Sequence, residues 1–156
     1  MKIFDQAMLS QLTDEAIGNP RRRKNLNIHP SDDFCAHRLF NAIEPGSYIR
    51  PHRHLAPAKD ETFVIIRGAL GVLMFDESGS ISASAVLTPG GPAFAVDIPH
   101  GSFHGAVSLA PGTVFFEAKA GPYLPLADDE IALWAPAEGT PESAAYLAAL
   151  TGLLVR

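Results

Sequence analysis

Residues 61–87 are ETFVIIRGALGVLMFDESGSISASAVL, a stretch composed of three short apolar or β-branched runs. The runs occupy residues 61–67, 69–75 and 81–87, and they are separated by Gly68 and by the polar segment at 76–79. Short runs divided by Gly, Asp and Ser are typical of β-strands joined by tight turns. Because no segment between them is long enough for a crossover helix, the pattern argues against parallel βαβ units.

The same pattern extends on both sides of this stretch. Further strands are predicted at residues 36–43, 93–98, 103–109 and 113–119. Seven or eight short strands without intervening helices predict an all-β barrel or sandwich.

A helix is predicted at each end of the chain. Residues 5–18 have apolar residues at helical spacing, with Asp5 as N-cap and Gly18 as a stop, and residues 141–155 begin with Thr140 as a cap and Pro141 in the first turn. We therefore expect one domain over residues 1–156: an N-terminal helix and arm at 1–33, a barrel at 34–120 and a C-terminal extension with a helix at 121–156.

The composition excludes several classes of function. The formal net charge is −5 and the basic residues form one short run at 21–24, so a nucleic-acid partner is not expected. The single cysteine, Cys35, has no internal disulfide partner. Without a secretory or membrane-spanning segment, the chain is expected to be cytoplasmic and away from membranes.

Three histidines and a glutamate form the strongest candidate site. His52 and His54 are two residues apart in GSYIRPHRH (46–54), so in extended backbone they project from the same face. Glu61 opens an apolar strand and shares its inward parity with Phe63 and Ile65. His104 follows a Pro- and Gly-containing turn at 99–103. Imidazoles together with a carboxylate predict a site for a divalent metal ion.

This arrangement resembles the two motifs of the cupin superfamily. The first is Gly46, five residues, His52-x-His54, then Glu61, six residues and Gly68; the second is Pro99-x-Gly101-x-x-His104. The resemblance implies a jelly-roll barrel, also called a double-stranded β-helix, that holds a metal through His52, His54, Glu61 and His104. Six residues separate His54 from Glu61, where the family has three or four, so Asp60 is an alternative carboxylate ligand.

Most of the chain is similar to one group within that superfamily, the WbuC-like cupins. The similar segments are RKNLNIH (23–29), FNAIEPG (40–46) and EAKAGPY (117–123). This group occurs with genes for O-antigen biosynthesis, which implies a polysaccharide-related context but no settled reaction. Analogy with cupin barrels that pair through exposed strand edges also implies a homodimer.

Other polar residues near the expected strands are candidates for ligand binding. Arg38, Tyr48 and Arg50 are predicted to bind substrate, because strand-borne arginines at a barrel mouth can hold a carboxylate or phosphate. His100 is a weaker candidate for a further ligand or an acid–base group, and the 21–24 run could reach an anionic ligand.

Three functions fit these observations. The first is an enzyme of isomerase or oxygenase type that uses one Fe, Mn, Ni, Co or Zn ion on a small anionic or sugar-derived metabolite. The second is a cupin that binds or senses a small-molecule ligand without turnover. The third is a metal-free sugar epimerase with a histidine base, which the clustering of three histidines disfavours.

Overall fold

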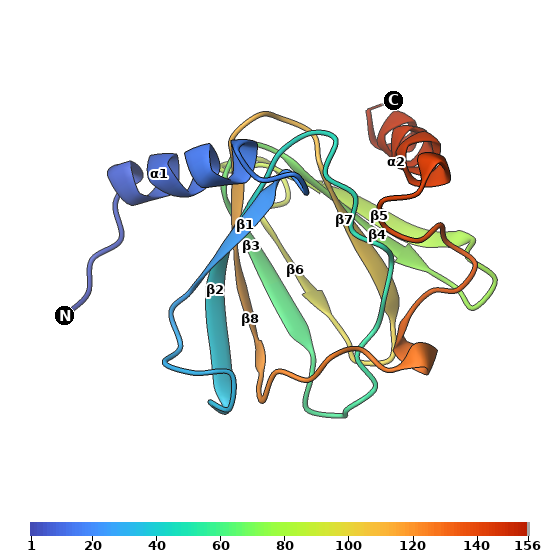
Figure 1. Ribbon diagram of the computed structural model, residues 1–156, viewed down its shortest axis with the longest axis horizontal. Helices are drawn as coiled ribbons and strands as arrows, with labels where there is room; N and C mark the ends of the chain where they lie inside the picture. The colour runs from blue at the N-terminus through green and yellow to red at the C-terminus, as the bar shows by residue number, and fades with distance from the viewer. Residues whose placement is uncertain (156) are drawn as a thin grey trace.

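The strands form two antiparallel sheets that face each other (Figure 1), and the computed structural model describes residues 1–155. One sheet contains, in spatial order, β1 (Arg23–Asn27), β2 (Ala36–Ile43), β8 (Thr113–Ala120), β3 (Glu61–Arg67) and β6 (Ala95–Ile98). The other contains β5 (Ile81–Leu87), β4 (Leu70–Phe75) and β7 (Phe103–Ser108). All seven strands predicted from the sequence are present, and each end lies within two residues of its predicted position.

Strand β1 was not predicted. Its sequence, RKNLN, pairs antiparallel with β2, and Asn25 lies opposite Asn41. On one face Leu26 packs against the N-terminal helix, while Arg23, Asn25 and Asn27 share the other face by alternation. The basic run at 21–24 therefore enters the sheet instead of forming only a loop.

The space between the two sheets holds an apolar core. The larger side chains of this core are Ile43, Phe63, Ile65, Leu70, Val72, Leu87, Ile98 and Phe115. Alternate residues of β4 and β7 point the other way, and they form a second cluster beneath the C-terminal part of the chain. Both faces of these strands are therefore covered, which explains why β7 is buried along its whole length.

Helix α1 (Gln6–Ile17) covers the outer face of β1, β2 and β8 (Figure 1). Asp5 caps it as predicted: its carboxylate accepts a hydrogen bond of 2.9 Å from the Met8 N–H. Leu9, Leu12 and Ala16 are buried against Phe40 and Ala42. Since Phe40 and Ala42 face the helix, alternation places their neighbours in β2 on the inner face.

Helix α2 (Pro141–Leu154) covers the outer side of the three-stranded sheet through Leu147 and Leu150. Pro141 occupies the first turn as predicted, but the Thr140 side chain makes no capping hydrogen bond; its hydroxyl donates to the Ala137 carbonyl instead. The stretch before α2 is irregular apart from a short 3₁₀ helix, η1 (Asp128–Glu130), and the Ala132 N–H donates to the Pro51 carbonyl. Across residues 1–155, no helix has the length and hydropathy needed to span a membrane.

Candidate metal centre and adjoining cavity

His52 and His104 come together through backbone pairing. The His52 N–H donates to the His104 carbonyl at 3.1 Å, and the His104 N–H donates to the His52 carbonyl at 2.9 Å. Residues that exchange both hydrogen bonds in an antiparallel pair project their side chains to the same face. The two rings accordingly lie 4.8 Å apart between centroids, and the His52 ring lies 5.4 Å from that of His54.

Glu61 is delivered by the register of the five-stranded sheet. It is the first residue of β3, and it lies opposite Ile98 of β6 on one side and Lys119 of β8 on the other. Glu61, Phe63 and Ile65 are all buried, as the predicted alternation requires. The carboxylate therefore enters an apolar interior from the end of a strand.

The carboxylate of Glu61 lies between the other groups. Its Oε1 is 3.2 Å from His54 Nε2 and its Oε2 is 2.8 Å from His104 Nε2. Potential ligand atoms of His52, His54 and Glu61 all lie within 4.8 Å of one another. His104 falls outside that mutual group but touches it through Glu61.

Backbone carbonyls set the tautomers of two of the rings. His52 Nδ1 lies 3.1 Å from the Arg50 carbonyl, and His104 Nδ1 lies 3.0 Å from the Ser102 carbonyl. Because a carbonyl oxygen can only accept, each Nδ1 carries a proton and donates it. A neutral ring then has its lone pair on Nε2, which is how metal-binding histidines are oriented in proteins.

The cluster contains buried polar atoms without partners. Among the described residues, four buried side-chain atoms lack a hydrogen bond, and three of them are His54 Nε2, Glu61 Oε2 and His104 Nε2. His104 Nε2 and Glu61 Oε2 are close but are not aligned for a hydrogen bond, and both carry lone pairs. A cation among these atoms would relieve their repulsion and desolvation. The donor set, imidazole nitrogens and one carboxylate, fits a divalent transition metal.

The cluster favours the protonation states that bind metal. Burial, and after it the neighbouring His104 ring, lowers the pKa of His52 to about 3, so this ring is neutral at pH 7. Burial would raise the pKa of Glu61, but the polar groups around its carboxylate, with the Lys119 ammonium at 2.7 Å, outweigh it and hold that pKa well below its ordinary value. A neutral imidazole and an ionised carboxylate are the forms that coordinate metals.

Lys119 joins Glu61 to a second buried acid. Its Nζ lies 2.7 Å from Glu61 Oε1 and 2.7 Å from Glu117 Oε1. Burial would lower the pKa of Lys119, but Glu117 and Glu61 outweigh it and raise the pKa above its ordinary value. Burial also raises the pKa of Glu117, whose other oxygen accepts a hydrogen bond of 2.7 Å from Asn41 Nδ2.

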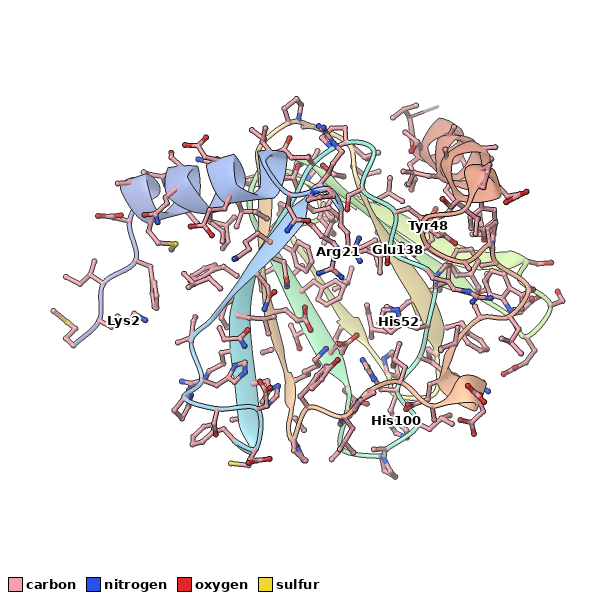
Figure 2. All side chains as sticks on the ribbon, viewed as in Figure 1. Lys2, Arg21, Tyr48, His52, His100 and Glu138 are labelled. Atoms are coloured by element: carbon pink, nitrogen blue, oxygen red, sulfur yellow. The ribbon has the colours of Figure 1, made fainter. Side chains whose placement is uncertain are left out.

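A cavity of about 340 Å³ opens beside this cluster. Its polar lining comes from the histidine and carboxylate cluster, from β8, and from β1, β2 and the loop before β1. The polar residues are His52, Glu61, His104, Glu117, Lys119, Arg21, Arg23, Lys24, Asn25 and Asn41. In Figure 2, Arg21 and His52 both lie over the interior between the sheets. Of these residues, sequence reasoning missed Glu117 and Lys119, although their alternation with the apolar Phe115 in β8 is a signal for inward orientation.

Three residues predicted to bind substrate lie elsewhere. Arg38 lies on the same face of β2 as Phe40, which is the outer face, and its exposed guanidinium lies 5.8 Å from the Phe34 ring centroid. Tyr48 is buried, and its hydroxyl donates to the Pro136 carbonyl. Arg50 Nε donates to the Ala132 carbonyl. None of the three lines the 340 Å³ cavity, and their role in substrate binding stays a prediction.

Asp60 and His100 pair with each other outside the cluster. Asp60 Oδ1 accepts hydrogen bonds from the His100 backbone N–H and from its Nδ1, both at 2.8 Å. Both side chains are exposed, at 53% and 43%. Glu61, with 3% of its side chain exposed, is therefore the carboxylate that the structure brings to the histidines.

Comparison with solved structures agrees with the fold. KdgF from Halomonas sp. matches with a TM-score of 0.51 and 22% identity, over 71% of this chain and 86% of that one. TT1209 from Thermus thermophilus matches with a TM-score of 0.54 and 19% identity, over 77% and 98% of the two chains. A cupin superfamily protein (DSY2733) from Desulfitobacterium hafniense DCB-2 matches with a TM-score of 0.49 and 11% identity, over 63% of this chain and 76% of that one.

The two facing antiparallel sheets, with a histidine and carboxylate cluster between them, define a cupin jelly-roll fold. Residues 4–87 match the family model described as "Domain of unknown function (DUF6016)", and the chain belongs to that family. No curated protein matches the chain.

Proposed function

We propose that this protein is a divalent-metal-binding cupin that acts on a small anionic metabolite, and that His52, His54, Glu61 and His104 hold the metal. The observation that carries the proposal is the set of buried lone-pair atoms that converge without hydrogen-bond partners. When bound, an Fe, Mn, Ni, Co or Zn ion would act as a Lewis acid or redox centre for chemistry of isomerase or oxygenase type.

The charges around the cavity favour an anionic ligand. Four basic side chains (Arg21, Arg23, Lys24 and Lys119) and two acidic ones (Glu61 and Glu117) line it. Arg23 is fixed by Glu138 at 2.8 Å, and Lys24 lies 3.4 Å from Glu15, whereas Arg21 is exposed at the mouth. With those two pairs neutralised, Arg21 and Lys119 balance Glu61 and Glu117, so the positive charge of a bound divalent ion would attract a carboxylate or phosphate toward the cluster, with Arg21 as a further cation at the cavity.

The protein's own groups would orient such a ligand. Lys119 has three N–H donors, of which Glu61 and Glu117 take two, so one remains for a ligand oxygen beside the cluster. Phe63 and Phe115 form part of the apolar wall and exclude water from the same space. These residues give a partly apolar site with one free ammonium donor next to the metal ligands.

Metal analysis of purified protein tests the ligand set. After loading with Mn²⁺ and dialysis, elemental analysis should find about one ion per chain in the native protein and a large loss in His52→Ala, His104→Ala and Glu61→Gln. Asp60→Asn is the matched control, because it alters the neighbouring acid outside the cluster. Full occupancy in Glu61→Gln together with loss in Asp60→Asn would refute the assignment of the carboxylate.

Catalysis is separated from binding by turnover assays. Oxygen consumption over a metabolite panel identifies an oxygenase, and product formation without oxygen uptake identifies an isomerase. Thermal stabilisation by a ligand that gives no product identifies a binding or sensing cupin. Activity that persists in metal-free protein would favour a metal-free epimerase and contradict our proposal.

We also propose membership of the WbuC-like group and a homodimer. Support for the first is that Asn25, Asn27 and His29, together with Glu117 and Lys119, come from segments similar to that group and line the hollows beside the cluster. Support for the second is that β5 is an edge strand with Ile81 and Val86 exposed at 38% and 37%. Light scattering coupled to size exclusion tests the dimer, and a monomeric mass at micromolar concentration would exclude it.

A further inference from the structure

A second hollow, of about 390 Å³, lies on the inner side of β1, β2 and β8. Asn25, Asn41, Glu117 and Lys119 line both this hollow and the 340 Å³ cavity, so the two spaces adjoin. Both volumes fall in the range of about 300–1,000 Å³ that is common for small-molecule sites. A ligand that reaches the metal cluster therefore has room to extend along the sheet.

Side-chain amides dominate one wall of this second hollow. Asn25 of β1 lies directly opposite Asn41 of β2, and Asn25 Nδ2 donates to Asn27 Oδ1 at 2.8 Å. Each amide has two N–H donors and a carbonyl with two lone pairs, so the bonds within the protein leave most of this capacity free. Adjacent donors and acceptors without charge match the hydroxyl groups of a polyol.

Two stacked histidines supply a second polar wall. The rings of His29 and His37 are buried and parallel, 3.9 Å apart with an interplanar angle of 7°. His29 Nδ1 lies 3.1 Å from the Arg38 N–H and 3.0 Å from the Arg38 carbonyl, so both contacts use the same nitrogen and Nε2 faces the hollow as a donor or an acceptor according to the tautomer. His37 Nε2 lies 3.0 Å from the Asp32 carbonyl and donates to it, which leaves Nδ1 as an acceptor. The pair therefore presents His29 Nε2 and the acceptor His37 Nδ1 to a ligand, and a hydroxyl group suits both because it can donate and accept.

The charge of this lining disfavours an anion. Glu117 and Lys119 neutralise each other at 2.7 Å, and Asp32 adds a negative charge. At the mouth, Tyr123 is 59% exposed and offers an apolar ring face to the C–H groups of a ligand. Arg21, an exposed cation, instead lines the first cavity.

We propose that the second hollow is a subsite for the hydroxylated part of an anionic polyol, a sugar acid or sugar phosphate. This inference rests on the proposed function, because the acidic end of the ligand would lie in the 340 Å³ cavity beside the metal cluster. The substrate of that site would then be a small acid that also carries several hydroxyl groups along one side.

Calorimetric titration of Mn²⁺-loaded protein tests the subsite with matched probes. D-gluconate and glucose 6-phosphate are the anionic polyols; hexanoate and inorganic phosphate are the corresponding acids without hydroxyls; sorbitol carries hydroxyls without an acid. At least one anionic polyol should bind about ten-fold more tightly than its matched acid, the effect of one or two net hydrogen bonds. Comparing the two anionic polyols then distinguishes a carboxylate from a phosphate.

The double variant Asn25→Ala/Asn27→Ala should lose this preference, measured as the ratio of the affinities for the anionic polyol and its matched acid, while the Mn²⁺ content stays unchanged because neither residue belongs to the metal cluster. Both side chains are exposed, so the fold is expected to persist. Gln11→Ala, which removes an exposed amide from α1, is the control and should change nothing. Anionic polyols that bind no tighter than their matched acids, or a preference retained in the double variant, would overturn the subsite. If the protein takes up no Mn²⁺, the proposed function fails, and the same titrations on metal-free protein still measure the subsite.

Discussion

Replacing Lys119 with methionine is the most informative change to the interior. Its ammonium group is the shared partner of Glu61 and Glu117, at 2.7 Å from each. The three side chains are 20%, 3% and 10% exposed, respectively, so water cannot take over the role of the lysine. The variant would therefore leave two buried carboxylates near each other without a cation.

Lys119→Met should lower the free energy of unfolding substantially, because it leaves two charged carboxylates buried without a cationic partner. Breaking a buried ion pair by removing one partner lowers the free energy of unfolding by about 3–5 kcal/mol. Lys24→Met is a matched control: its pairing with Glu15 is 3.4 Å long and both side chains are nearly half exposed, so the loss there should stay below about 1 kcal/mol.

Urea denaturation at pH 7 with a chelator present measures both variants without metal. In a Glu117→Gln background the Lys119→Met change should cost at least about 1 kcal/mol less, because one orphaned carboxylate is already neutral. A loss below about 1 kcal/mol for Lys119→Met in the native background, equal to that of the Lys24 control, would refute the view that this lysine holds the two acids in place.

Three further predictions concern stability. Burial lowers the pKa of His52 to about 3 from its ordinary value of 6.5, so between these pH values the unfolded chain binds more protons than the folded protein. The urea midpoint of metal-free protein should therefore fall when the pH is lowered from 7 to 5. An unchanged midpoint would contradict the burial of a neutral ring. Gly68 has φ +80°, and an added Cβ would lie 2.7 Å from the Thr113 Cα, so Gly68→Ala should lower the melting temperature by the equivalent of about 2 kcal/mol or more. Gly90 is also at positive φ but in open space, so Gly90→Ala should lower the melting temperature less. Tyr48→Phe removes the hydrogen bond to the Pro136 carbonyl and should cost about 1 kcal/mol by chemical denaturation; a neutral effect would show that this bond adds nothing net.

The sequence predicted the strands with apolar alternation well, for a physical reason. Runs such as 61–67 and 81–87 combine β-branched residues with Gly, Asp or Ser at their ends, and both the pairing and the turns follow from local chemistry. The parity of Glu61, Phe63 and Ile65 also indicated which carboxylate points inward, despite the long spacer after His54.

Strand β1 escaped prediction because its inner face is polar. In RKNLN the residues that point inward are Arg23, Asn25 and Asn27, so the usual rule of apolar residues inside is broken where the strand borders the cavity. Only Leu26 packs against a hydrophobic cluster. The same reason hid Glu117 and Lys119, which lie inside the barrel on a strand whose other residues are mostly apolar.

Arg38, Tyr48 and Arg50 show what sequence cannot fix. Proximity to the predicted site suggested ligand binding, but the direction of each side chain depends on tertiary contacts. Arg38 lies on the face of β2 that turns away from the cavity, and the other two hydrogen-bond to backbone carbonyls of the 121–139 stretch. That stretch has no periodicity, so its path over the barrel edge, and the partners it offers, could not be read from its residues.

Anomalous diffraction from crystals of Mn²⁺-loaded protein tests the central claim most directly. We expect one strong peak inside the barrel, within about 2.0–2.3 Å of ring nitrogens of His52, His54 and His104 and of a Glu61 oxygen. Absence of a peak at this position in protein shown to contain the metal, or a single peak at the exposed His100 and Asp60 pair, would contradict the account.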